Sequence, residues 1–234
     1  PQPPGIRPLY LDDLYLEQPA LALDQARREL GRLGGLVDDM LKRSLRVVTT
    51  GTEREVNRLM AADDDVDVIY RDCIRFLGKL SQKDLVGTQP HELSTFVGIA
   101  NYLENVGDVI ETDLLGEARK RIQTGLTISP ATVVKIGAID EEVRRTFAKA
   151  LAAVETGDVA DAADAIESKH IVNDLAKAAT DHLAKRLVAH EPSRLEAFNI
   201  ETDIVENYQR INTYARRIAR LCLAIEANDI DADD

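Results

Sequence analysis

Residues 19–56 have the sequence PALALDQARRELGRLGGLVDDMLKRSLRVVTTGTEREV, and the fold class can be predicted from this segment. Its apolar residues recur at spacings of three and four, which is the period of a helix with one buried face. Thr50-Gly51 interrupts the pattern, and Thr52 with Glu55 has the spacing of a capping box that begins another helix. The folded part of the chain should therefore start with a long helix, a short break and a second helix.

The rest of the sequence continues in the same way. Breaks are predicted where helix-ending or helix-starting residues gather, at Val86-Gly87 with Pro90, at Ser129-Pro130, at Thr156-Gly157-Asp158 and at Glu191-Pro192. Between them lie helices expected at about 52–82, 90–125, 130–156, 162–189 and 193–227. The sequence therefore predicts an all-α protein of six long helices.

The six helices form two similar sets of three. Thr50-Gly51 and Thr156-Gly157 are 106 residues apart, and Asn105-Val106 aligns with Arg210-Ile211 at an offset of 105. We predict two tandem three-helix units packed as one elongated six-helix bundle. The expected divisions are a Pro-rich, extended lead-in (1–17), a first unit (18–125), a second unit (126–228) and an acidic tail (229–234).

Composition narrows the classes of function. The 234-residue chain has a net charge of −12, which argues against nucleic-acid binding because phosphates attract stripes of Lys and Arg. No apolar run approaches the roughly 18 to 20 residues that cross a bilayer, so we expect a soluble segment of cytosolic type. The Pro-rich start suggests a segment of a longer protein.

Acidic residues distinguish the first unit from the second. The first unit has the pairs Asp63 with Asp67 and Glu104 with Asp108, each four residues apart, whereas the aligned positions of the second unit are Lys169, Asn173, Gln209 and Thr213. A core position would remain apolar in both copies. These positions changed chemistry instead, which favours contact with something specific to the first unit.

The two acidic pairs should meet in space. The second and third helices are joined by a short loop and should pack antiparallel, and both pairs lie about 25 Å from that loop at about 1.5 Å per residue. Residues four apart share a helix face, so each pair can act together. Four adjacent carboxylates repel unless they are protonated or neutralised, and a cation that prefers oxygen ligands is the leading candidate.

The alternative is that residues 63–67 form a solvated face. Against it, the run of Asp residues is expected deep within a helix, where it costs roughly 2 kcal/mol of helix propensity. No His lies in the cluster, which argues against a dedicated zinc site. Asp38, Asp39 and Asp64 lie at the same height, and we expect them to support the ligands or face solvent rather than bind the ion.

Two motifs resemble those of PhoU-type phosphate regulators. Leu103-Glu104-Asn105-Val106-Gly107-Asp108 is similar to the Leu-Glu-Arg-Ile-Gly-Asp signature of that family, with Asn105 in place of Arg. Residues 63–69, DDDVDVI, resemble its other acidic helix. The loss of both acids from the second copy, and the lead-in before residue 23, resemble the cytoplasmic PhoU domain that follows the membrane part of bacterial sodium/phosphate cotransporters.

The resemblance implies a regulatory domain, not an enzyme, that modulates phosphate transport and homeostasis at the inner face of the cell membrane. It implies a metal bound by Asp63, Asp67, Glu104 and Asp108, with iron or zinc as the family's metals; magnesium, manganese and calcium stay open. The implied partner is a phosphate transporter's membrane domain or complex, and a second copy of the chain is another candidate.

Two other functions stay open at this point. A metal-free helical module could use the acids to contact a basic partner. A metal-dependent hydrolase would need a His or Lys beside the ion as acid or base, and the first unit offers none at that level.

Overall fold

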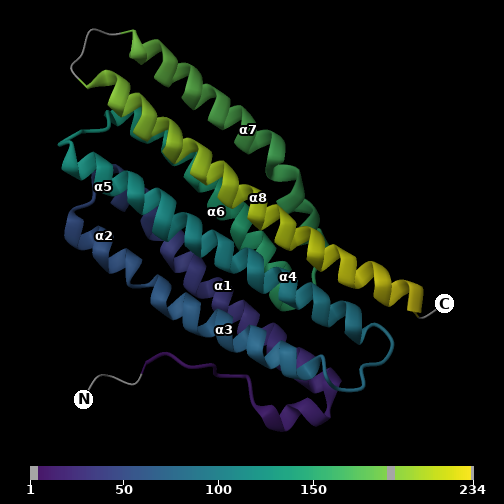
Figure 1. The fold of residues 1–234 in the computed structure, drawn as a ribbon. Coiled ribbons are helices and arrows are strands. Elements are labelled where there is room, and N and C mark those ends of the chain that lie inside the picture. The colour runs from purple at the N-terminus through teal and green to yellow at the C-terminus, as the bar shows by residue number, and fades with distance from the viewer. Residues whose placement is uncertain (1–4, 189–192, 233–234) are drawn as a thin grey trace.

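Helices run through the whole structure (Figure 1). It is a computed structural model that describes residues 5–188 and 193–232, and within these ranges it contains no β-strand. In chain order the segments are η1 (Asp13–Glu17), α1 (Pro19–Thr50), α2 (Glu53–Met60), α3 (Asp63–Leu80), α4 (Gln89–Asp108), η2 (Val109–Leu114), α5 (Leu115–Gln123), α6 (Pro130–Thr156), α7 (Val159–Leu187) and α8 (Arg194–Ala232). The predicted all-α class is confirmed.

These segments join into the six expected rods, but the second rod is not one helix. It consists of α2 and α3, which are separated by a turn at Ala61 and Ala62. Both alanines keep helical dihedral angles. The Ala62 N–H donates to the Leu59 carbonyl, three residues earlier, at 3.1 Å, which is the pattern of a 3₁₀ turn and not of an α-helix. Asp63 therefore begins a helix, and the prediction that it lies deep within one is wrong.

The third rod is continuous but changes its helix type. The segment η2 between α4 and α5 is a π-helix, in which the Leu115 N–H donates to the Ile110 carbonyl five residues earlier. Beyond it, Arg121 of α5 donates from Nε to the Val48 carbonyl at 3.0 Å and from Nη2 to the Gly51 carbonyl. The third rod thereby satisfies carbonyl groups at the end of the first.

The predicted helix ends are present at three breaks. Thr52 and Glu55 form the capping box that opens α2. Ser129 Oγ accepts from the Thr132 N–H at the start of α6, with Pro130 in the first turn. Gly157 ends α6 with a φ of 74°, a left-handed conformation that glycine adopts without steric cost.

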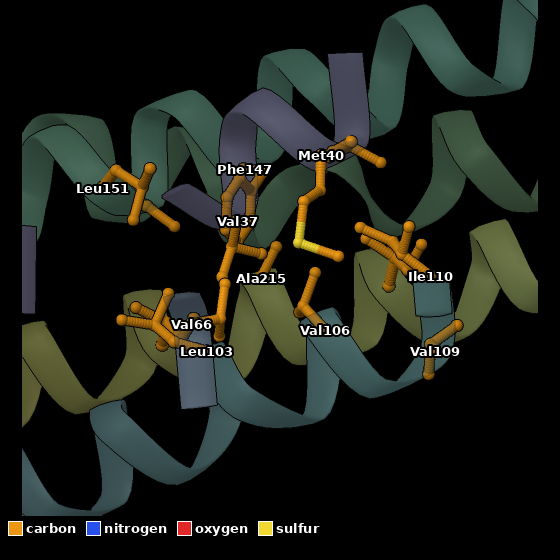
Figure 2. Close-up of a cluster of buried hydrophobic side chains, with 14 of the residues drawn as sticks. Val37, Met40, Val66, Leu103, Val106, Val109, Ile110, Phe147, Leu151 and Ala215 are labelled. Carbon is orange, nitrogen blue, oxygen red and sulfur yellow. The ribbon is translucent and has the colours of Figure 1, made fainter. Parts of the chain in front are cut away.

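The two three-helix units share one core. Helices α1, α3 and α4 pack together, as do α6, α7 and α8, and the units meet where α1 contacts α6 and α4 contacts α8. Figure 2 shows side chains from both units in one cluster, among them Val37 and Met40 of α1, Leu103 of α4, Phe147 of α6 and Ala215 of α8. The chain therefore folds as a six-helix bundle rather than as two independent domains.

A buried polar contact also joins the units. The Tyr208 hydroxyl of α8 lies 2.8 Å from Ser44 Oγ of α1, and neither residue is exposed to solvent. A buried hydroxyl without a partner would be costly, so this hydrogen bond fixes how α8 sits on α1.

The described part of the lead-in packs against the first unit and is only partly extended. Backbone N–H groups of Leu9 and Tyr10 both donate to Glu29 Oε2 at 2.8 Å, and Glu29 is fully buried. Asp13, in the short helix η1, pairs with Lys79 of α3 at 2.5 Å. Residues 5–17 of the predicted lead-in thus pack on the folded body, and residues 1–4 lie outside the part of the chain that the structure describes.

The other end of the chain also differs from expectation. Helix α8 extends to Ala232, so the acidic tail expected from residue 229 is helical over its first residues. None of the helices in the described ranges has a stretch that is long and apolar enough to cross a membrane.

Candidate functional site

Two pairs of acidic side chains face each other where α3 packs against α4. Asp63 and Asp67 belong to α3, and Glu104 and Asp108 belong to α4. At Gly107 the Asp63 side chain lies against the backbone of α4, because a Cβ atom added there would lie 2.9 Å from Asp63 Oδ1. The absence of a side chain at residue 107 therefore makes room for the Asp63 carboxylate.

The location of Asp63 changes the physical argument for its presence. Asp63 lies in the first turn of α3, where the unsatisfied N–H groups and the helix dipole favour negative charge. The Asp run therefore needs no compensation for poor helix propensity. What remains to be explained is the burial of carboxylates beside one another.

Burial and mutual repulsion raise the pKa values of these acids. Burial, followed by the charges of Asp67, Glu111 and Asp108, raises the pKa of Asp63 from 3.8 to about 7. Burial, with Asp67 and Asp108, raises the pKa of Glu104 from 4.5 to about 8. Burial, followed by the charges of Asp67, Glu111 and Asp113, raises the pKa of Asp108. Near neutral pH the cluster therefore holds protons that ordinary carboxyl groups would have released.

Two carboxylate oxygens in the cluster are buried without a hydrogen-bond partner in the protein, Asp63 Oδ1 and Glu104 Oε2. The basic group of Arg71 is 4.0 Å from Asp67 Oδ2 and is largely exposed, so its screening of the cluster is weak. A buried anionic oxygen without a partner is costly. The cluster therefore lacks a positive charge at its centre.

The donors fit a hard cation, since carboxylate oxygens are the ligands that such ions prefer. In the ranges that the structure describes, however, no three His, Cys, Asp or Glu side chains are grouped closely enough to hold a metal. Binding an ion would therefore require Asp63, Asp67, Glu104 and Asp108 to turn toward a common point.

Sequence reasoning missed one acid of this cluster. Glu111 lies in η2, and its charge raises the pKa values of both Asp63 and Asp108. Its spacing could have revealed it, because residues three and seven positions after Asp108 and Glu104 lie on the same helix face. Tyr70 of α3 also faces the cluster: burial, Glu104 and Asp108 raise its pKa.

The acids of α1 do not join the cluster in the same way. Asp38 Oδ2 lies 2.5 Å from Lys42 Nζ of its own helix, and this contact raises the pKa of Lys42. The charge of Arg144 on α6 opposes that rise in the pKa. Asp39 is exposed. The expected common height is thus not accompanied by a common direction. Asp64 is exposed at the edge of the cluster, where its charge contributes to the raised pKa of Asp63.

The aligned positions of the second unit carry no carboxylates. Gln209 Nε2 donates to Asn173 Oδ1 at 3.4 Å, and Thr213 Oγ1 donates to the Gln209 carbonyl at 3.0 Å. Lys169 is exposed. An amide–amide hydrogen bond therefore joins α7 and α8 at the level where the first unit has buried acids.

A comparison with protein families assigns the chain. The PhoU domain family matches residues 30–112 and, a second time, residues 138–222. The chain belongs to the PhoU family. Each match covers most of one three-helix unit, which confirms the predicted duplication.

Relatives and solved structures agree with this assignment. YjbB of Escherichia coli K12, named as a candidate inorganic phosphate export protein, is 24% identical over 229 residues, and YjbB of Salmonella typhimurium LT2 is 24% identical over 208 residues. These matches cover 98% and 89% of this PhoU chain but only 42% and 38% of the relatives. The chain thus spans about two fifths of their length.

Crystal structures of PhoU proteins share the fold. PhoU from Pseudomonas aeruginosa superposes with a TM-score of 0.82 at 19% identity, covering 90% of this chain and 99% of that one. The phosphate transport system regulatory protein PhoU from Streptococcus pneumoniae gives a TM-score of 0.78 at 12% identity, covering 89% and 97%. At these identities the likeness shows the six-helix fold alone.

Proposed function

We propose that this PhoU domain regulates phosphate transport, and that a cation between α3 and α4 sets the form in which it does so. The observation that carries the proposal is the pair of buried carboxylate oxygens without partners, Asp63 Oδ1 and Glu104 Oε2. The YjbB relatives are named for phosphate export and are more than twice as long as the matched region, which supports a regulatory domain attached to a transporter at the inner membrane face.

The cation would be held by Asp63, Asp67, Glu104 and Asp108, with Glu111 adding negative charge beside them. Bound there, the ion supplies positive charge that neutralises the carboxylates and links the two helices. Iron or zinc is what the resemblance in the sequence motifs implies, and the all-oxygen donor set also suits magnesium, manganese or calcium. Because the carboxyl groups must lose their protons to bind an ion, binding should release protons at neutral pH.

A regulatory role fits this site better than catalysis. The charged groups that most raise the pKa values of Asp63 and Glu104 are other carboxylates. A catalytic site would be expected to place a His or Lys beside them as the second member of an acid–base pair. A cation at the N-terminal end of α3 could act by changing the position of that helix. Because Lys79 of α3 pairs with Asp13 of the lead-in, such a movement would be passed to the segment before α1.

The test combines metal analysis with stability. Purified chain is analysed for bound metals, and its melting temperature is measured with and without EDTA. Bound metal should stabilise the fold by about 4 kcal/mol at a thousandfold excess over the dissociation constant, and EDTA should remove this gain. An Asp63→Ala/Glu104→Ala variant should lose both the metal and the effect of EDTA, whereas an Asp65→Ala control, changed at an exposed neighbour, should keep them.

A metal-free interaction module is the second candidate, and the lack of a ready-made group of three ligands in the described residues favours it. In that case Asp64, Asp65 and Asp108, which are exposed, would contact a basic partner. Absence of metal from protein purified without chelator, with a melting temperature that EDTA leaves unchanged, would select this candidate over the first.

A further inference from the structure

A second acidic site lies between α5 and α8, away from the four acids described above. The two helices contact each other, and a cavity of about 570 Å³ opens between them. Its lining includes Glu117 and Lys120 of α5 and Glu196, Thr202 and Asp203 of α8. A cavity of this size falls in the range of small-molecule sites, and its lining combines charged side chains with the apolar Phe198 and Ile200.

Glu117 is the buried acid of this cavity. Its side chain is only 7% exposed, and Oε1 accepts a hydrogen bond from Lys120 Nζ at 2.6 Å. The other oxygen, Oε2, is buried and has no partner in the protein. Thr202 Oγ1, across the cavity on α8, is also buried without a partner. Two residues that line one cavity, Glu117 and Thr202, thus each have a buried polar atom without a hydrogen-bond partner.

Charges along this pair of helices are unbalanced. Next to the cavity, Arg210 of α8 donates to Asp113 of η2 at 2.7 Å and to Asn207 at 3.2 Å. The charge of Asp113 is therefore balanced by a guanidinium group on the facing helix. At the following step Glu117 faces Asp203, whose charge adds to the effect of burial in raising the pKa of Glu117. Lys120 alone offsets these acids and Glu196 among the charged residues that line the cavity.

We propose that this cavity binds an organic dication with guanidinium or ammonium groups, one group donating to the Glu117 carboxylate and the other facing Asp203 and Glu196. The neighbouring Arg210 shows the chemistry, since it is a guanidinium held by a carboxylate and an amide oxygen on the same two rods. Guanidinium groups have several N–H donors in a fixed plane and match carboxylates well.

The arrangement suits spaced donors better than a bare ion. Among the described residues no three acids here are grouped closely enough to hold a metal. A cavity of about 570 Å³ also exceeds the roughly 30 Å³ that one water-sized ion would fill. The same chemistry can come from a free diamine or from neighbouring basic side chains of a partner protein, and the experiment separates these sources.

Isothermal titration calorimetry of the 234-residue chain with agmatine, which carries a guanidinium and an ammonium group, tests the proposal. Agmatine should bind, and butylguanidinium, a monocation, should bind at least about tenfold more weakly. Glu117→Gln and Asp203→Asn should each weaken agmatine binding about tenfold or more, because a hydrogen bond to a charged group is lost. Glu206→Gln, at an exposed position of α8 nearby, is the matched control and should bind normally.

Two further arms complete the experiment. A peptide with two adjacent arginines that binds more tightly than agmatine would assign the source to a partner protein, and the reverse would assign it to a free diamine. The Asp63→Ala/Glu104→Ala variant should bind agmatine normally, so this proposal can fail independently of the cation site. Equal binding by all variants, or displacement of agmatine by magnesium at equal ionic strength, would overturn it. Thermal melts of Glu117→Gln and Asp203→Asn verify that each variant is folded.

Discussion

Asp63→Asn should stabilise the cation-free protein above neutral pH. The folded-state pKa of Asp63 is about 7, whereas the unfolded chain has the ordinary value of 3.8. Between these values the unfolded chain has released a proton that the folded protein retains, so the free energy of unfolding falls as pH rises. Below both values Asp63 contributes no penalty, and above about pH 7 the full penalty applies. Asparagine has the same shape and cannot ionise, so it removes this term.

The magnitude follows from the size of the pKa shift. About three pKa units at about 1.36 kcal/mol each give an upper limit of about 4 kcal/mol. Asp63 is only partly buried, however, and solvent screens part of this energy. The expected penalty in the wild-type protein is therefore about 1–2 kcal/mol at about pH 8 relative to about pH 5.

Urea unfolding in the presence of EDTA measures this difference. Wild type, Asp63→Asn and Asp65→Asn are compared at about pH 5 and about pH 8. Asp65 is an exposed member of the same run, and its variant should show the wild-type dependence on pH. Asp63→Asn should lose distinctly less stability between the two pH values. If its pH dependence equals that of the wild type, the carboxylates of the cluster do not strain the fold and the electrostatic reasoning fails.

Three other predictions concern packing and hydrogen bonds. Gly107→Ala should stabilise the protein in urea unfolding by less than the roughly 1 kcal/mol that alanine gains over glycine in a helix, because the added methyl group displaces Asp63 Oδ1. The full gain should return in an Asp63→Ala background, and additive effects would refute the contact. Glu29→Gln should speed hydrogen exchange at the Leu9 and Tyr10 amides by about tenfold, because their hydrogen bonds to a charged carboxylate are lost. Unchanged protection of these two amides would contradict this. Tyr208→Phe should lower the free energy of unfolding by about 1 kcal/mol, since the buried hydrogen bond to Ser44 is lost while Ser44 keeps its bond to the Leu41 carbonyl. Calorimetry showing no loss would disprove this tie between the two units.

The rods and most of their ends could be predicted because their signals are local. Thr52 with Glu55, Ser129 and Gly157 each act through their own backbone neighbourhood. The turn at Ala61 and Ala62 gives no such signal, since alanine is the best helix former and predicts a helix that continues through both residues. The π-helix η2 is equally silent in the sequence.

The site was predictable in height but not in direction. Residue counts from a loop fix the level of Asp63 and Glu104 along the rods, and α3 and α4 bring them together. The same count placed Asp38 at this level, but α1 buries Val37 and Met40 against the other helices. Asp38 instead pairs with Lys42 of its own helix. The pairing of Glu117 with Asp203 joins residues far apart in the chain and needs the tertiary structure.

The π-helical turn at Val109–Leu114 has a consequence for the third rod as a whole. One residue more than an α-helical turn needs is accommodated there, so winding the same residues as a regular α-helix would rotate one end of the rod by about 100° relative to the other. The acids at 104 and 108 would then be out of phase with Arg121, whose guanidinium caps the first rod. The π-helical winding of this one turn therefore sets the angular alignment between the acidic surface of α4 and the Arg121 side chain that anchors α5 to the end of α1.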